Sequence, residues 1–147
     1  MSFVELSIPD PGLAGRPRFD STLDLWEYTV RSANEACLLL DSGGIVVAAS
    51  AGCGELLSFG ATDAAGRRLV DLLRLLDFNT VAGKLPQGEI EKIPPLLAIA
   101  TAGLSRGLLR LPGTDGKPDT VDAVSVALRD GTTVVGSLTF FAPVKKT

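Results

Sequence analysis

The spacing of apolar residues predicts a helix at residues 20–35, near the start of the chain. Its apolar positions recur at the three- and four-residue spacing of one helix face, and they are Leu23, Trp26 and Val30. Asp20 or Ser21 can cap this helix by accepting a backbone N–H. The apolar stripe has to be buried, either against the sheet of its own domain or against a second copy. Residues 1–19 contain three prolines and two glycines, which indicates an extended or flexible arm.

Two apolar runs separated by a short polar segment predict a β-hairpin. The runs are residues 36–41 and 44–49, and the segment at residues 41–44 ends in two glycines, which tight turns favour. Because neither run alternates with polar residues, both faces of these strands are expected to be covered. Ser50 follows where a short helix, residues 51–57, is expected to begin, and its hydroxyl can cap that helix.

The middle of the chain predicts two further helices around a polar loop. Residues 63–76 place several leucines on one helix face, whereas residues 77–93 are polar and contain glycine and proline. Pro94 and Pro95 suit the first turn of a helix, where a missing N–H has no partner to lose. Residues 96–104 are apolar nearly all round and are expected to form a buried helix.

The last third of the chain predicts three strands, at residues 107–111, 120–128 and 132–141. The segments between them, residues 113–118 and 129–132, both contain Asp-Gly and are expected to be hairpin turns. The predicted order is strand, strand, helices and three strands. This order indicates an α+β domain, with a five-stranded antiparallel sheet, helices packed on one face and an amphipathic helix in front.

Composition narrows the function. The chain has 147 residues, the length of one domain, and a net charge of −3 with scattered lysines and arginines. Binding to nucleic acid would need a basic stripe, and a membrane-spanning segment would need a longer apolar run. We therefore expect neither a nucleic-acid partner nor a membrane span. The sequence has no histidine, which removes the commonest general base and the usual haem and zinc ligand. Cys37 and Cys53 lie among apolar residues as free thiols, and without a signal peptide this indicates the cytoplasm.

Three stretches resemble motifs of the PAS domain family. "LLLDSGGIVVAAS" (38–50) resembles the opening strand pair, and "AAGRRLVDLL" (64–73) resembles the Gly-Arg and leucine-rich turn of a later helix. "SAGCGELLSF" (50–59) resembles the short helix that an Asn begins and that ends in Gly-Tyr. The Asn, Gly and Tyr of that pattern are replaced here by Ser50, Ser58 and Phe59. The resemblance covers roughly residues 22–142 and includes the element order.

The resemblance implies a sensory or protein-interaction module. It makes residues 36–142 the PAS-like domain, residues 20–35 a flanking helix and residues 143–147 a tail. PAS domains commonly dimerise through a helix in that position, so we expect a homodimer through Leu23, Trp26 and Val30. Because the chain shows no kinase, cyclase or helix-turn-helix segment, we expect a stand-alone regulatory module without enzymatic activity. It would act in signal transduction through a partner protein that the sequence does not name.

The resemblance also argues against known PAS cofactors. Leu69 stands where light-oxygen-voltage members carry a reactive Cys, so we expect no flavin adduct, and without histidine we expect no His-ligated haem. The haem ligand that the sequence leaves open is a thiolate of Cys37 or Cys53. Flavin bound without an adduct would find few aromatic or amide side chains in the predicted core. Arg110 alternates with leucines in its predicted strand, so we expect it to face solvent rather than bind a small acid. No cofactor is therefore predicted.

The remaining binding site is an aliphatic pocket between the sheet and the helices. It would suit a small apolar ligand such as a fatty acid, with Thr101 or Ser125 as a polar anchor. The same residues can instead form a filled core, which would make the chain a ligand-free scaffold or dimerisation domain. The expected lining of the pocket consists of Cys53, Leu57, Leu69, Leu73, Leu97, Thr101, Leu109, Val124, Val126, Leu138 and Phe140.

Two further hypotheses concern single residues. Cys53 would need a lowered pKa to act as a redox sensor, and the absence of a basic neighbour favours a buried structural thiol instead. An enzyme of the ketosteroid-isomerase-like fold would need an acid inside an apolar pocket. Asp122 is the candidate for that acid, and a position on the surface would end the hypothesis.

Overall fold

The computed structural model describes residues 21–78, 83–113 and 117–144. Its elements are α1 (Thr22–Ser32), β1 (Cys37–Asp41), β2 (Val46–Ala49), α2 (Ala51–Leu57), α3 (Ala61–Ala64), α4 (Leu69–Leu72), α5 (Gln87–Ile90), α6 (Pro94–Thr101), β3 (Leu104–Leu111), β4 (Asp119–Asp130) and β5 (Thr133–Pro143). The arm predicted at residues 1–19 lies outside the described residues, and so do the last three residues of the predicted tail. None of the described helices is long and apolar enough to cross a membrane.

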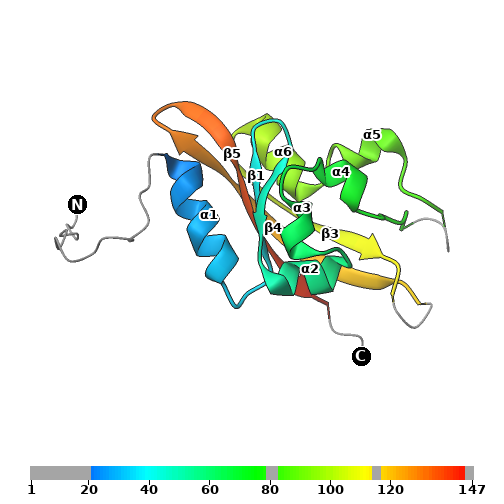
Figure 1. Ribbon diagram of the computed structural model, residues 1–147. Coiled ribbons are helices and arrows are strands. Elements are labelled where there is room, and N and C mark those ends of the chain that lie inside the picture. The colour runs from blue at the N-terminus through cyan, green and yellow to red at the C-terminus, as the bar shows by residue number, and fades with distance from the viewer. Residues whose placement is uncertain (1–20, 79–82, 114–116, 145–147) are drawn as a thin grey trace.

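The strands form one antiparallel sheet in the order β2-β1-β5-β4-β3 (Figure 1). The β1–β2 hairpin lies at one edge, and the helices α2 to α6 connect it to β3 at the opposite edge. β5, which comes last in the chain, lies between the two parts and pairs with both β1 and β4. The predicted α+β fold with a five-stranded antiparallel sheet is confirmed.

Alternate residues of the strands point into two apolar layers. On the inner face, Leu40 and Val121 belong to a core that includes residues of α2, α3 and α4 and contacts α6. On the outer face, Leu39 and Leu138 pack with Val30 of α1. The sheet therefore has helices α2 to α6 on one side and α1 on the other. β1 contributes to both layers, as its uninterrupted apolar sequence predicts.

The hairpin turn forms where the sequence predicts it. Asp41 accepts the backbone N–H groups of Gly43 and Ile45 on its Oδ1, at 2.8 and 3.0 Å. Gly44 takes a φ of +79°, a conformation that costs little without a Cβ. The side chain and the glycine together reverse the chain between β1 and β2.

Ser50 bonds to three backbone groups at the start of α2. Its Oγ accepts the N–H of Cys53 at 3.2 Å, which caps the helix as predicted. The same oxygen accepts the N–H of Cys37 at 2.9 Å, and its proton goes to the carbonyl oxygen of Glu35 at 2.7 Å. One buried hydroxyl thus fixes the helix against the beginning of β1.

The single helix predicted at residues 63–76 is instead two short helices, α3 and α4. Gly66 lies between them with a φ of +87°, which ends the helical path. Its N–H donates to the carbonyl of Val46 at 2.8 Å, and the N–H of Val46 donates to the carbonyl of Arg67 at 2.9 Å. These bonds to β2 replace the bonds of a continuous helix. The leucine spacing predicted the helix but contained no information about this tertiary pairing.

The boundaries around α6 also differ from the prediction. The loop predicted at residues 77–93 contains the one-turn helix α5. The next helix starts at Pro94, as expected, but ends at Thr101 because Ala102 takes a left-handed φ of 57°. β3 then begins at Leu104, which pairs with Val126 of β4, and so it is longer than the predicted strand.

Candidate functional site

A cleft of about 620 Å³ opens between α2, the α3–α4 segment and the end of β3. This volume lies within the range of small-molecule sites. Three leucines from these three segments, Leu57, Leu72 and Leu111, form the apolar part of a lining that is otherwise largely polar. Leu57 and Leu111 are buried members of the inner core, and Leu72 is partly buried against it. We call this feature the α2–α4 cleft.

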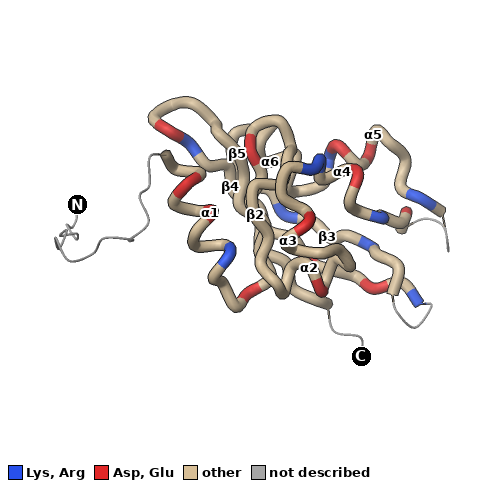
Figure 2. The backbone as a smooth tube through the Cα atoms, viewed as in Figure 1, with Lys and Arg blue, Asp and Glu red and all other residues tan. Residues whose placement is uncertain are grey.

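Charged side chains of both signs line the same cleft, and they are Asp63, Arg67, Asp71 and Arg74. All four are exposed, and none of their side chains forms a hydrogen bond or ion pair within the described ranges. In a continuous helix, the four-residue spacing of the first three would favour ion pairs. Figure 2 shows positions of both signs on the α3–α4 segment. The break at Gly66 thus accompanies a rim of charges that remain available to a ligand.

A second cleft, of about 240 Å³, lies between α6, β3 and the segment after α4. Its lining is largely apolar and includes Leu75, Leu85, Leu97 and Leu109. Arg110 lies at this cleft and donates from Nη1 to the carbonyls of Asp77 and Phe78, at 3.0 and 3.4 Å. The guanidinium therefore ties a loop to β3, where the sequence predicted a solvent-facing side chain. We call this feature the α6 cleft.

Neither protein-family models nor the sequences of curated proteins match the chain. Solved structures do match its fold. A PAS domain from Colwellia psychrerythraea matches with a TM-score of 0.57 at 16% identity, over 84% of this chain and 98% of that chain. A PAS domain from a two-component sensor histidine kinase matches with a TM-score of 0.52 at 16% identity, over 82% and 94%. The chain has the PAS fold. A third structure, VqmA bound to DPO, matches with a TM-score of 0.58 at 20% identity, over 84% of this chain and 59% of that chain.

The PAS inner layer brings together only part of the predicted pocket. The residues that belong to its core or pack against it are Cys53, Leu57, Leu69, Leu73 and Leu109. Cys53 and Leu69 are fully buried there. Leu57 reaches the α2–α4 cleft, whereas Leu97 and Leu109 reach the α6 cleft. Thr101 is exposed and donates its hydroxyl to the carbonyl of Leu97 at 2.9 Å, so it is not an anchor inside the layer.

The other predicted pocket residues lie on the outer face of the PAS sheet, and they are Val124, Val126, Leu138 and Phe140. Val124 pairs with Phe140 and Val126 with Leu138, while Leu138 packs in the layer beneath α1. These four residues do not line a pocket with Cys53, which corrects the expectation of one shared lining. Alternation identifies residues that share a face of a strand, but it does not say which face the helices cover.

Ser125, the other predicted anchor, does point to the inner face. It is fully buried, and its hydroxyl lies 2.6 Å from the hydroxyl of Thr139 on β5. The two hydroxyls share one hydrogen bond inside the sheet. Ser125 is thus part of the packed layer between strands and offers no unpaired group to a ligand.

The α1 stripe is covered by the sheet of its own chain. Val30 is fully buried, and Leu23 and Trp26 pack against the same outer layer. The N-terminus of α1 is also fixed to the β4–β5 hairpin, because the hydroxyl of Thr22 donates to the carboxylate of Asp130. The sequence left two partners open for this stripe, the sheet of its own domain or a second copy. In the structure the stripe packs on the sheet of its own chain. A dimer interface formed by Leu23, Trp26 and Val30 would require α1 to leave this position.

Cys53 has the surroundings of a structural thiol. It is fully buried, and burial raises its thiol pKa to about 12, with a smaller contribution from Cys37. Burial raises the pKa of Cys37 as well, against an opposing hydrogen bond with Ser50. Both thiols are therefore neutral near neutral pH, whereas a redox sensor or a haem thiolate needs a lowered pKa.

Asp122 lies on the outer face of the sheet and lines neither cleft. Arg106 donates to its carboxylate from Nε at 3.2 Å and from Nη2 at 2.6 Å. These hydrogen bonds hold the pKa of Asp122 below its usual value. A general acid or base of the ketosteroid-isomerase type needs a raised pKa in an apolar pocket. The position and the pKa of Asp122 contradict that alternative, and the PAS fold does so independently.

The charged rim of the α2–α4 cleft was missed from the sequence. Arg67 entered the sequence prediction only through a Gly-Arg motif, and the helix predicted at residues 63–76 gave no role to Asp63, Asp71 or Arg74. The usable signal was Gly66, because a glycine inside a helical pattern raises the possibility of a break. A break there would have directed attention to charges that a helix could no longer pair.

Proposed function

We propose that this chain is a PAS-type regulatory module that binds a small ligand in the α2–α4 cleft. The observation that carries the proposal is the combination of a few apolar side chains with four unpaired charges in one cleft of about 620 Å³. Pockets that bind small molecules are typically apolar with a few polar groups that fix the orientation. The fold supports a sensor-type role, because PAS domains are usually non-catalytic sensor modules.

The cleft favours a ligand with an apolar body and at least one charged group. Leu57, Leu72 and Leu111 would contact the apolar body, while Arg67 and Arg74 would bind an anionic group. The acidic side chains would favour a cationic group on the same ligand. This proposal differs from the wholly apolar ligand expected from the sequence. VqmA bound to DPO contains a matching fold over 59% of its chain, which supports ligand binding as the class of function.

Anilinonaphthalene sulfonate tests the proposal, because it combines aromatic rings with one anionic group and fluoresces when bound. We expect saturable binding to the full chain. Arg67→Gln combined with Arg74→Gln is expected to weaken binding by about tenfold, the effect of losing charge-assisted hydrogen bonds. Arg68→Gln is the matched control, since Arg68 is equally exposed and unpaired but does not line the cleft. Equal binding by all variants would contradict the proposal.

We also propose that the module signals through a partner protein in a reducing compartment such as the cytoplasm. The free, buried thiols of Cys37 and Cys53 suit such a compartment. A ligand-free scaffold is the second candidate, and the complete burial of Cys53 and Leu69 in the inner core favours it. Native mass spectrometry of freshly purified protein separates the two candidates. A co-purified small molecule would support sensing, and a clean mass together with no probe binding would support the scaffold.

A further inference from the structure

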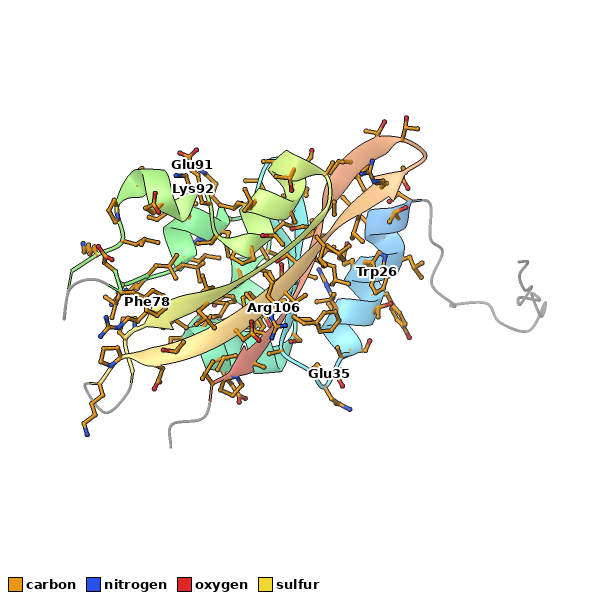
Figure 3. The ribbon with its side chains drawn as sticks, turned by 180° about the vertical axis from the view of Figure 1, so that it is seen from behind. Trp26, Glu35, Phe78, Glu91, Lys92 and Arg106 are labelled. Carbon is orange, nitrogen blue, oxygen red and sulfur yellow. The ribbon has the colours of Figure 1, made fainter. Side chains whose placement is uncertain are left out.

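β3 forms one margin of the sheet, and one of its two edges faces away from the other strands. Near the C-terminal end of β3, the carbonyl of Arg110 accepts the N–H of Leu76 at 2.8 Å, which covers part of this edge. In the rear view of Figure 3, Arg106 marks β3 at this margin, and Phe78 lies beside the end of the strand. Among the described residues, the backbone cover of the edge is limited to that end.

The hydrogen bonds at the two ends of β3 show which backbone groups point outward. Gly103, just before the strand, turns its carbonyl to Ala127 beside it, whereas Arg110 turns its carbonyl away from β4. These directions alternate in an antiparallel pair without a register shift, so the even-numbered residues from Leu104 to Leu108 also point their N–H and C=O groups outward. These backbone groups have no hydrogen-bond partner in the described part of the chain, and the three residues are exposed.

The open edge lacks the features that usually protect an edge strand. Proteins shield such edges with very short strands, prolines or bulges. β3 has eight residues, contains no proline and pairs with β4 without a register shift. Two of its leucines, Leu104 and Leu108, are 73% and 53% exposed. An edge of this kind accepts an extended segment, which adds to the sheet through main-chain hydrogen bonds.

The α6 cleft runs along the same edge. Residues 105–110 of β3 all line it, so the cleft contacts both alternating sets of side chains, as a feature at the sheet margin does. Its volume of about 240 Å³ is below the range of roughly 300–1,000 Å³ that is typical of small-molecule sites. Its lining includes Leu97 and Leu109. Apolar side chains of an added strand suit this space better than a separate ligand does.

The chain itself contains a segment that matches the edge. Residues 3–8 read "FVELSI", and every second residue from Val4 to Ile8 is a large aliphatic one. This alternation is typical of a strand with one apolar face. Glu5 is the only charged residue of the segment and is opposite in sign to the arginines of β3. Pro9 follows directly, where a strand inside a sheet would have to end.

The start of α1 lies close enough to β3 for this segment to reach the edge. The hydroxyl of Thr22 donates to the carbonyl of Arg129 at 3.2 Å, and Arg129 donates from Nη2 to the carbonyl of Ala102, two residues before β3. Residues 9–21, which connect the segment to α1, can span about 40 Å when extended. Since α1 starts near the Leu104 end of β3, the shortest connection makes the segment run antiparallel to β3.

We propose that residues 3–8 add to the open edge of β3 as a sixth, antiparallel strand of the same chain. One alternating set of their side chains covers the α6 cleft, and the other set lies beside Leu104 and Leu108. The inference goes beyond the proposed function, because Leu104, Arg106 and Leu108 do not line the α2–α4 cleft and the added strand needs no ligand.

Amide hydrogen exchange of the full chain, followed residue by residue by NMR, tests the added strand. Glu5→Pro combined with Leu6→Pro removes one N–H from each alternating set of the segment, so it disrupts the pairing in either register. We expect the amides of Leu104, Arg106 and Leu108 to exchange at least about tenfold faster in this variant than in the wild-type chain.

Two controls separate the pairing from a general loss of stability. Leu13→Pro combined with Ala14→Pro places two prolines in the connection to α1 and is expected to leave the exchange unchanged. The alternate amides of β3, which point to β4, are expected to keep their protection in every variant. Wild-type exchange at the three outward-facing amides that is as fast as in the variant with Glu5→Pro and Leu6→Pro would overturn the proposal.

A nitroxide attached to Ser7→Cys shows whose segment occupies the edge. Cys37 and Cys53 are buried, so the new thiol is labelled first. We expect the amide signal of Leu104 to broaden in a chain that carries the nitroxide itself. In a mixture of nitroxide-bearing chains with isotope-labelled chains that lack it, we expect no broadening. Broadening in the mixture would mean that a second copy supplies the strand, and a sharp signal in the nitroxide-bearing chain would mean that the segment is elsewhere. Either result overturns the proposal.

Discussion

Ser50 shows how one side chain can fix a junction. Its hydroxyl makes three hydrogen bonds inside the protein, to Cys53, Cys37 and Glu35, and it is fully buried. The sequence predicted the bond to Cys53, because N-capping depends only on local spacing. It did not predict the bonds to Cys37 and Glu35, because those depend on the hairpin that brings residues thirteen and fifteen positions away next to Ser50.

Replacement of Ser50 by alanine is expected to lower the free energy of unfolding by about 2–3 kcal/mol, since two N–H groups and one carbonyl lose their partner in a buried site. Urea denaturation followed by circular dichroism measures the change. The control is Ser32→Ala, which removes one exposed hydroxyl bonded to the carbonyl of Tyr28. It is expected to change stability by less than about 0.5 kcal/mol. Equal effects of the two variants would contradict the role of Ser50.

The raised pKa of Cys53 makes stability depend on pH in the alkaline range. Below about pH 9 the thiol is neutral in both states, and its contribution to folding is complete. Between about pH 9 and 12 the unfolded chain ionises its thiol first, so the free energy of unfolding falls as the pH rises. We expect urea midpoints to decline less steeply over this range in Cys53→Ala than in the wild-type chain.

Alkylation provides an independent measurement on the same thiol. We expect iodoacetamide to modify Cys53 of the native chain much more slowly at neutral pH than in urea, because both burial and protonation suppress the reaction. Fast labelling of native Cys53, located by mass spectrometry of its peptide, would contradict a structural thiol.

At the scale of elements, local signals predicted where chain segments begin better than where they end. The turn before β2, the start of α2 at Ser50 and the start of α6 at Pro94 all follow from adjacent residues. The end of α3 at Gly66 depends on hydrogen bonds to β2, which no local pattern encodes. The covered face of β4 was equally undetermined, because Val121 and Ala123 alternate with Val124 and Val126 and both sets are apolar.

Ala102 at the end of α6 gives a prediction with a built-in control. Its φ of 57° brings the Cβ too close to the backbone, a strain that glycine avoids. We expect Ala102→Gly to raise the free energy of unfolding by about 0.5–1 kcal/mol after the entropy of the freer unfolded chain is subtracted. Ala100→Gly, at an exposed position within α6, is expected to lower it by about 1 kcal/mol. Urea denaturation of both variants measures the two effects, and a loss of stability in Ala102→Gly would contradict the helix end described here.

At the scale of the whole molecule, β1 makes the two layers depend on each other. Leu38 and Leu40 point into the inner core and Leu39 into the layer beneath α1, and all three are fully buried. Separation of α1 would expose Leu39 and Leu138 to water, and disruption of the inner core would remove the strand on which α1 packs. A ligand in the α2–α4 cleft would therefore stabilise the folded state that both layers share.

This dependence predicts that α1 unfolds together with the sheet. Trp26 is the only tryptophan of the chain and lies in the outer layer, so its emission reports on α1, while circular dichroism reports on the whole fold. We expect both signals to change at one urea midpoint, measured at a fixed protein concentration because dimerisation would shift it.

Val30→Ala removes buried methyl groups beneath α1. It is expected to lower the free energy of unfolding by about 2 kcal/mol and to shift both midpoints equally. Val144→Ala, at an exposed valine, is the matched control and should leave both in place. A tryptophan transition at lower urea than the circular dichroism transition would mean that α1 detaches on its own, and its apolar stripe would then be free for a second copy after all.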